Sequence, residues 1–343
     1  MSLRSPLVLC AVIVGVLAMA APASAQKPTG SAVKSSVPRA PDGRPDLQGV
    51  WDFRTVTPLE RPDAFATQAQ LTAEQAAALE AQAAASFVDR PPPKGSVGGY
   101  NLFWFDTRSS AVEDRRTSLI VDPPDGKVPA LAPNAKQQVG SLEENRPSDL
   151  PIRYRVGGRG YDGPEDRGLA ERCLIGYSSG PPMLPGGYNQ NVQLFQTSDH
   201  VVIVNEMVHD ARIIPLNGRP HLPSDLRQWM GDSRGRWDGD TLVVETTNFT
   251  SKTASFNPTV TSAIGSGETL DLTERFTLVD ARTIRYEYTV NDPATFTKPI
   301  TAVIYLRKSE EQMFEYACHE GNYGLLNILR GARAAESVSR ESR

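Results

Sequence analysis

The chain contains four histidines, and all of them lie in its second half: His200, His209, His221 and His319. Glu206 and Asp210 flank His209, and Glu320 directly follows His319. A carboxylate next to a histidine orients the imidazole ring and raises its pKa, which is the minimum that general acid–base catalysis requires. We therefore predict His209 and His319 as catalytic bases with these carboxylates as partners. The alternative is that both histidines are structural residues at the end of a β-sheet.

Glu274 is a carboxylate on an otherwise apolar face of a predicted strand. Between Leu270 and Leu278 every second residue is apolar except Glu274. Burying an unpaired carboxylate costs several kcal/mol, so this group must be paired or protonated. We expect it either to pair with an arginine such as Arg236 or Arg212, or to act as a catalytic acid with a raised pKa in a pocket.

A predicted loop over residues 215–232 joins two strands and carries groups that could bind a ligand. Loops that a rigid sheet holds in place are frequent positions of functional residues. Aromatic and polar residues of the flanking strands would face the same ligand if the sheet encloses a cavity. The predicted substrate-binding residues are Asn205, Arg212, Arg219, His221, Trp229 and Tyr288.

Two motifs that often mark catalytic or metal sites are expected to be structural in this chain. Ser178 and Ser233 each lie in a G-x-S-x-G pattern, but neither has the preceding strand and following helix of a hydrolase elbow. On one strand, Glu206 and His209 would point to opposite faces and could not share a metal ion by themselves. We predict no serine nucleophile, no metal site and no cofactor.

The elements that must position these residues are strands. From residue 192 onward apolar and polar residues alternate, which is typical of antiparallel strands with one buried face. Predicted strands cover residues 192–197, 201–208, 236–237, 241–249, 269–279, 283–291, 299–307 and 312–318. A long meander tends to close on itself because closure removes exposed edges. The prediction is a mainly β fold: an antiparallel up-and-down, lipocalin-like barrel with long loops and a few peripheral helices.

The first 25 residues have the composition of a secretory signal peptide. Arg4 precedes an apolar run too short to span a membrane, and Ala23-Ser24-Ala25 gives a small-x-small cleavage pattern. We predict cleavage after Ala25 and a periplasmic or secreted location. A flexible leader is expected over residues 26–45 and a single β-barrel domain over residues 46–338.

The predicted barrel domain contains an irregular, helix-containing insertion over about residues 60–190. Its helix is expected over residues 72–87, where Thr72-Ala73-Glu74-Gln75 forms a capping box before an alanine-rich run. A second helix is expected over residues 325–336.

Two cysteines remain after the signal peptide is removed, Cys173 and Cys318. An oxidising compartment favours a disulfide between them, and neither belongs to a C-x-x-C pair. Metal ligation and catalysis are the alternatives. The net charge is −4 without a block of like charge, so nucleic acid and anionic lipid are not expected as partners. No later apolar run reaches membrane-spanning length, and the oligomeric state is left open.

Several specific runs occur along the chain: PDGRPDLQGVW at 41–51, NEMVHD at 205–210, GDSRGRWDGDTL at 231–242 and CHEGNY at 318–323. With these runs the chain resembles a large group of secreted bacterial proteins without assigned activity. The resemblance spans nearly the whole mature chain and implies export and one shared fold, but it implies no catalytic residues. Gly-x-Trp at 49–51 and at 235–237 also resembles the opening strand of lipocalin-like barrels.

Together these observations predict an exported protein that holds a small apolar or phenolic molecule at a barrel mouth. It could be a cofactor-free hydrolase or lyase that uses a histidine and a carboxylate. Alternatives are a non-catalytic binding or carrier protein and an envelope structural protein. A cavity with converging histidine, carboxylate and arginine would favour the enzyme, whereas a dry apolar cavity would favour the carrier. A filled barrel with an exposed apolar patch would favour the structural role.

Overall fold

A computed structural model of the protein describes residues 37–86, 94, 105, 110–133, 135, 155 and 160–341. The chain divides into two units, Met1–Ser35 and Ser36–Arg343, and every described residue belongs to the second. The predicted signal peptide and most of the predicted leader therefore lie outside the described residues, as do parts of the predicted insertion.

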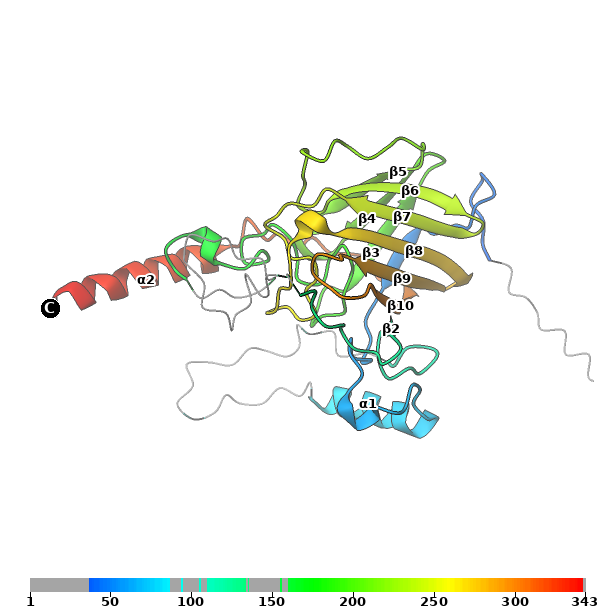
Figure 1. Ribbon diagram of the computed structural model, residues 1–343, viewed down its shortest axis with the longest axis horizontal. Helices are drawn as coiled ribbons and strands as arrows, with labels where there is room; N and C mark the ends of the chain where they lie inside the picture. Colours follow the sequence, from blue (N-terminus) through cyan, green and yellow to red (C-terminus); the bar gives the residue numbers. More distant parts are fainter. Residues whose placement is uncertain are drawn as a thin grey trace, which may run out of the picture. The chain divides into compact units, whose positions relative to one another are not determined.

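The described part of the chain is mainly antiparallel β, as the sequence predicts (Figure 1). Ten strands form one sheet in the order β5-β4-β3-β1-β10-β9-β8-β7-β6, and β2 also pairs with β10. The strands are β1 Gly49–Asp52, β2 Ile120–Asp122, β3 Asn191–Gln196, β4 His200–Asn205, β5 Ala211–Pro215, β6 Asp232–Asp238, β7 Thr241–Thr247, β8 Asp271–Asp280, β9 Thr283–Asn291 and β10 Ile300–Ser309.

The predicted closed barrel is not confirmed, because no hydrogen-bonded ladder joins the end strands β5 and β6. The strand order supplies a reason. β1 enters between β3 and β10, so the path from β5 to β6 contains nine strands, and each neighbouring pair is antiparallel. With an odd number of alternating strands, β5 and β6 run in the same direction. A direct antiparallel closure between them is therefore impossible.

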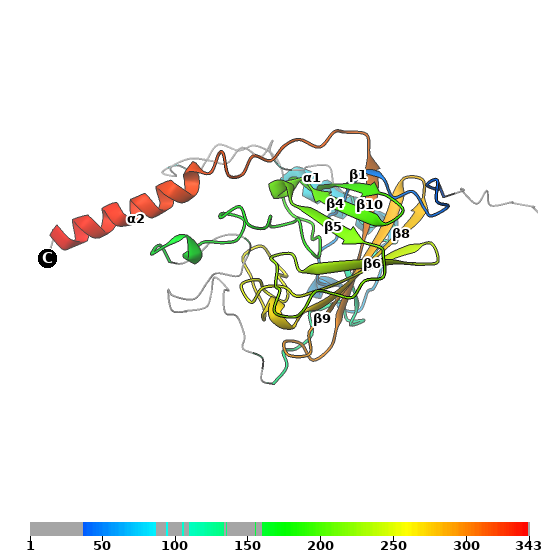
Figure 2. The ribbon, with the colours of Figure 1, turned by 90° about the horizontal axis from the view of Figure 1, so that it is seen from above.

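The two end strands β5 and β6 are labelled in Figure 2, and side chains rather than a ladder bring them together at one point. A Cβ atom built on Gly235 of β6 would lie 2.9 Å from Ile214 of β5 and 2.6 Å from Leu216 just after it. Only glycine leaves room for these two side chains. We call the line along which β5 and β6 face each other the seam.

Alternating side chains of the strands form the main core on the concave face of the sheet. Trp51 is fully buried and donates from Nε1 to the carbonyl of Leu47 at 2.8 Å, which anchors the start of the sheet in the core. Tyr286, Tyr288 and Phe276 belong to the same core cluster as Trp51 and are also fully buried. The alternation predicted for β8 and β9 is confirmed by their burial.

Two predicted strands differ from the structure. β4 ends at Asn205, and Met207–His209 forms a short 3-10 turn, so the prediction of a strand through residue 208 is wrong. The amide of Asn205 bonds the carbonyl of Asp210, which closes this turn and reverses the chain into β5. Residues 312–318 form no strand, because β10 already lies between β9 and β1 and offers no free edge.

The described residues contain two α-helices, α1 Ala73–Ser86 and α2 Tyr323–Glu341. The predicted capping box is confirmed, since the amide of Gln75 bonds Thr72 Oγ1 at 3.2 Å and Gln75 Oε1 accepts from the amide of Thr72 at 2.9 Å. Short 3-10 turns occur at Asp63–Phe65, Pro164–Asp166 and Gly267–Thr269. No helix among the described residues is long and apolar enough to cross a membrane.

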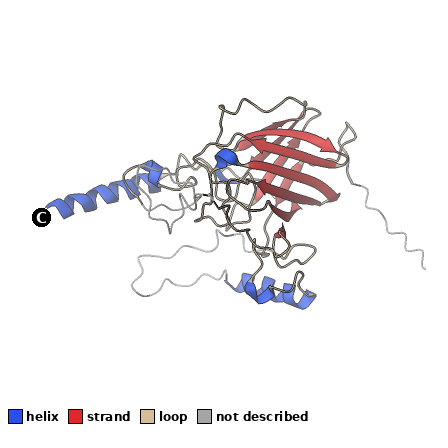
Figure 3. Cartoon of the chain, in the orientation of Figure 1, coloured by secondary structure: helices blue, strands red, loops and turns tan. Residues whose placement is uncertain are grey.

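The predicted Cys173–Cys318 disulfide is confirmed and joins residues 145 positions apart. It ties the loop segment 160–190 (Figure 3) to the segment that follows β10. Asn322 strengthens this junction by donating to the carbonyl of Glu171 at 2.7 Å. Cys173 also packs with Met207 in a small separate cluster of buried side chains.

We predict that replacing both Cys173 and Cys318 by serine lowers the free energy of unfolding by about 2–5 kcal/mol, because the cross-link restricts a long loop in the unfolded chain. Urea denaturation followed by tryptophan fluorescence would measure the loss. Wild-type protein treated with a reductant should match the double variant. An unchanged urea midpoint in both samples would contradict a stabilising role for the cross-link.

Candidate functional site

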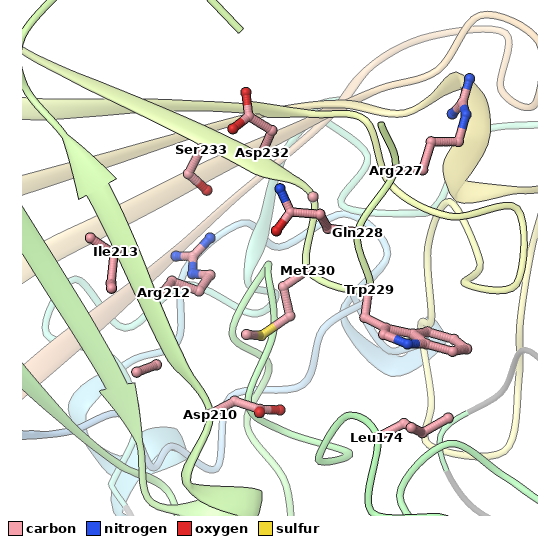
Figure 4. A pocket seen from close by; sticks show the side chains of 12 residues that line it. Leu174, Asp210, Arg212, Ile213, Arg227, Gln228, Trp229, Met230, Asp232 and Ser233 are labelled. Atoms are coloured by element: carbon pink, nitrogen blue, oxygen red, sulfur yellow. The ribbon is translucent and has the colours of Figure 1, made fainter. Parts of the chain in front are cut away.

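A cleft of about 580 Å³ opens at the seam between β5 and β6 (Figure 4). This volume is in the range of pockets that bind small organic molecules. Its walls come from β5, from the loop before β6 and from the start of β6: Leu174, Asp210, Ala211, Arg212, Ile213, Arg227, Gln228, Trp229, Met230, Gly231, Asp232 and Ser233.

The cleft exists because the seam is closed at one end only. Ile214 and Leu216 fill the space beside Gly235. Two residues earlier on each strand, at Arg212 of β5 and Ser233 of β6, the seam is open, and these two residues line the cleft. In Figure 4 Arg212 lies toward the middle of this opening.

Backbone hydrogen bonds hold the loop wall of the cleft in place. The amide of Gln228 bonds the carbonyl of Asn248, and the carbonyl of Gln228 accepts from the amide of Thr250. Arg227 Nη1 donates to the carbonyl of Phe249 at 3.0 Å. These bonds fix the backbone that leads into Trp229, so this part of the wall is preformed.

A buried ion pair holds Arg212, one of the residues that line the cleft. Arg212 of β5 reaches across the concave face to Glu274 of β8, with Nη1–Oε2 and Nη2–Oε1 distances of 2.7 and 3.0 Å. The two side chains are 4% and 0% exposed. Of the alternatives for Glu274, the arginine pairing is therefore confirmed, and the partner is Arg212. Arg236 pairs instead with the half-exposed Glu245.

Tyr286 extends this pair deeper into the core. Its hydroxyl donates to Glu274 Oε1 at 2.8 Å and accepts from the amide of Met183 at 3.2 Å. Burial, followed by the negative charge of Glu274, raises the pKa of Tyr286 well above its ordinary value. Burial lowers the pKa of Arg212, but the charge and hydrogen bonds of Glu274 together outweigh this and raise it. Arg212 therefore keeps its positive charge in the core beside Glu274.

Several buried polar atoms have no hydrogen-bond partner within the described part of the chain. Among them are Arg212 Nε, the side-chain amide of Asn205 and the hydroxyl of Tyr288. Arg212 lines the cleft, whereas Asn205 and Tyr288 do not. An unpaired buried donor costs about 1–3 kcal/mol, so Arg212 Nε is the group in the cleft wall that gains most from a ligand acceptor.

A histidine–carboxylate pair borders the cleft. His221 Nδ1 lies 2.9 Å from Oδ2 of Asp232, a buried residue at the start of β6. Asp232 also accepts from the amide of Leu222 and forms an ion pair with Arg234 Nη1, each at 2.9 Å. The contacts with His221 and Leu222 fasten the loop to β6, and the contact with His221 also orients its imidazole.

The structure brings together only some of the predicted site residues. Asp210, Arg212 and Trp229 line the cleft, and His221 touches it through Asp232. His319 and Glu320 are exposed residues next to Cys318 and do not line it. Glu206 is buried and accepts from Asn191 Nδ2 at 2.9 Å. Arg219 is exposed in the loop, and the side chain of His209 lies outside what the structure describes.

The sequence prediction missed Gln228, Met230, Asp232 and Ser233 as residues of the site. Asp232 and Ser233 lie in the glycine-rich run at 231–235, which is the signal that could have identified them. Gln228 and Met230 carry no comparable signal, because only the fold of their loop turns them toward the seam. The described residues include no group of three or more histidine, cysteine, aspartate or glutamate side chains placed to hold a metal ion.

No protein-family model and no curated protein matches the chain.

We predict that Glu274→Gln lowers the free energy of unfolding by about 3–5 kcal/mol, because it leaves the buried cation of Arg212 uncompensated. Urea denaturation would measure the change. The matched control is Glu245→Gln, which removes a half-exposed partner of Arg236 and should cost less than about 1 kcal/mol. Replacing Arg212 and Glu274 together by leucine should recover most of the loss. Equal losses for the two glutamine variants would refute a special role for the buried pair.

Proposed function

We propose that the protein is exported and binds a small organic molecule in the seam cleft. Export is supported by the pattern of the first 25 residues and by the resemblance to secreted bacterial proteins. The disulfide is compatible with an oxidising compartment. Within this proposal the sheet is an incompletely closed variant of a lipocalin-like barrel, and the seam takes the place of the barrel mouth.

The observation that carries the proposal is a preformed cleft lined by Arg212, whose buried Nε–H has no hydrogen-bond partner among the described residues. A carbonyl, carboxylate or phenolic oxygen on the ligand would accept this hydrogen bond. Trp229 and Met230 supply apolar surface next to it, which suits the rest of a small apolar or phenolic molecule. Large aromatic side chains fill the concave face, so the ligand is assigned to the seam.

We expect Arg212→Lys to weaken ligand binding about tenfold. Lysine keeps the charge opposite Glu274 but lacks the Nε–H group, so the variant removes one hydrogen bond to the ligand. Trp229→Ala should weaken binding by a similar factor through lost apolar contact. Isothermal titration with a panel of phenols and aryl carboxylates would measure both effects.

The control for this titration is Phe314→Ala, which removes a highly exposed aromatic residue that does not line the cleft. It should bind every compound as wild type does. A compound that binds with the same affinity to all four proteins would place the ligand elsewhere and contradict the proposal.

A second candidate function is hydrolysis by acid–base catalysis at the cleft, and the His221–Asp232 pair favours it. Asp232 is in position to orient the imidazole of His221. The carboxylate is itself held by a backbone amide and by Arg234, which limits its movement. In this version the base is His221, in place of the predicted His209 and His319.

If the protein is a hydrolase of this kind, His221→Ala should lower kcat for aryl esters about a hundredfold. His200→Ala is the matched control, since His200 of β4 lies beside the exposed carboxylate of Asp199 and does not line the cleft. Release of the phenol can be followed by absorbance. Equal activity of the two variants, or no activity in the wild type, would leave the binding role as the proposed function.

A further inference from the structure

The direction of the two edge strands suits one more strand at the open end of the seam. β5 and β6 run in the same direction, because they are the first and the last of nine strands that alternate in direction in the described sheet. A strand that runs in the opposite direction would be antiparallel to both edges. Beside Gly235 the two edges are too close to admit it, so such a strand could lie only at the open end, where the cleft is.

The edge of β5 offers backbone groups for such a strand. The amide of Asn205 bonds the carbonyl of Asp210, and the amide of Leu216 bonds the carbonyl of Asp199. In an antiparallel ladder every second residue faces the partner strand, so residues 210, 212, 214 and 216 face β4. The N–H and C=O groups of Ala211 and Ile213 therefore face the seam, and both residues line the cleft.

The edge strand β6 also turns backbone N–H and C=O groups toward the seam. Asp238 and Thr241 pair across a two-residue turn, and such a closing pair is hydrogen bonded. Alternation from this pair turns the backbone groups of Ser233 toward the seam. The carbonyl of Ser233 accepts from Arg234 Nη1 at 2.9 Å, which is consistent with this direction.

We propose that the ligand of the seam cleft is a short extended peptide, which binds as an antiparallel strand along the edge of β5. This inference rests on the proposed function, namely that the cleft binds a ligand, and it names the chemical class of that ligand. Hydrogen bonds from peptide groups to Ala211 and Ile213 would supply the main recognition, as in other cases of strand addition to a sheet edge.

The length of the free edge limits the occupant to a short peptide. Pro215 has no N–H and ends the usable part of β5. Ile214 and Leu216 close the seam beside Gly235, so a bound strand stops there. Only Ala211 and Ile213 remain to pair, which suits a free peptide of a few residues better than a second sheet.

The side chains beside the edge indicate which peptide fits. Ile213 is 65% exposed and continues an outer apolar row through Val202 to Phe195. A peptide residue opposite Ile213 would extend this row and should be apolar. Its neighbours would point to the inner side, where Arg212 Nε has no partner among the described residues, so they should carry hydrogen-bond acceptors. The favoured pattern is polar–apolar–polar.

The test uses the full mature protein and a dansylated peptide amide of sequence Gly-Thr-Val-Thr, with Gly-Val-Thr-Val as the peptide of opposite register. Fluorescence anisotropy should detect binding of the first peptide and at least about tenfold weaker binding of the second. N-methylation of the central valine should weaken binding by a similar factor, because it removes a backbone donor without changing the side chains.

Protein variants and hydrogen exchange provide an independent readout. Ile213→Pro removes the edge N–H and should weaken binding about tenfold, whereas Ile213→Val keeps it and should bind as wild type does. On peptide binding, exchange at the amides of Ala211 and Ile213 should slow. The amide of Arg212, which already faces β4, serves as the internal control and should not change.

The outcomes separate this inference from the proposed function. If phenols bind in a Trp229-dependent manner and the peptide does not, the peptide inference is wrong and the binding function stands. If neither binds, both fail. Peptide binding with unchanged exchange at Ile213 overturns the strand-addition geometry. If the Ile213 amide is already protected without peptide, or Ile213→Pro converts a dimer into a monomer, another segment of this chain or a second copy occupies the edge and the proposal is wrong.

Discussion

The ion pair between Arg212 and Glu274 is the interaction on which the rest of the structure depends. It joins β5 to β8 across the concave face, although 62 residues and several strands separate them. Two buried charges are stable only when each satisfies the other. The pair therefore ties β5 to β8 across the inner face of the sheet. It also leaves one buried donor of Arg212, Nε, without a partner among the described residues.

Strand parity is the second constraint, and it explains why a cleft lies at this place. A sheet of nine strands, each antiparallel to its neighbours, ends in two edge strands that run in the same direction. β5 and β6 therefore cannot form an antiparallel pair across the seam. Gly235 allows the two edges to touch at one end, and the other end stays open. The loop before β6 then covers the opening, held by the bonds of Gln228 and Asp232.

This arrangement connects the fold to the proposed chemistry. A ligand at the seam would meet fixed donors on one wall and the apolar surface of Trp229 and Met230 on the other. His221 borders the same space through Asp232. Ligand binding, strand addition and acid–base catalysis would thus all use residues around the same cleft. The buried Arg212–Glu274 pair holds the β5 wall of that cleft in place.

The sequence by itself predicted the antiparallel strands and the capping box at Thr72, since both follow from local patterns. It favoured a disulfide between the two cysteines outside the predicted signal peptide, and it required Glu274 to be paired or protonated because of the cost of an unpaired buried charge. Only the tertiary structure decided that the partner is Arg212, that β1 enters between β3 and β10, and that Gln228 and Met230 face the cleft. The physical reason is that alternation fixes which face a side chain takes, but strand order and loop path depend on contacts between residues far apart in the chain.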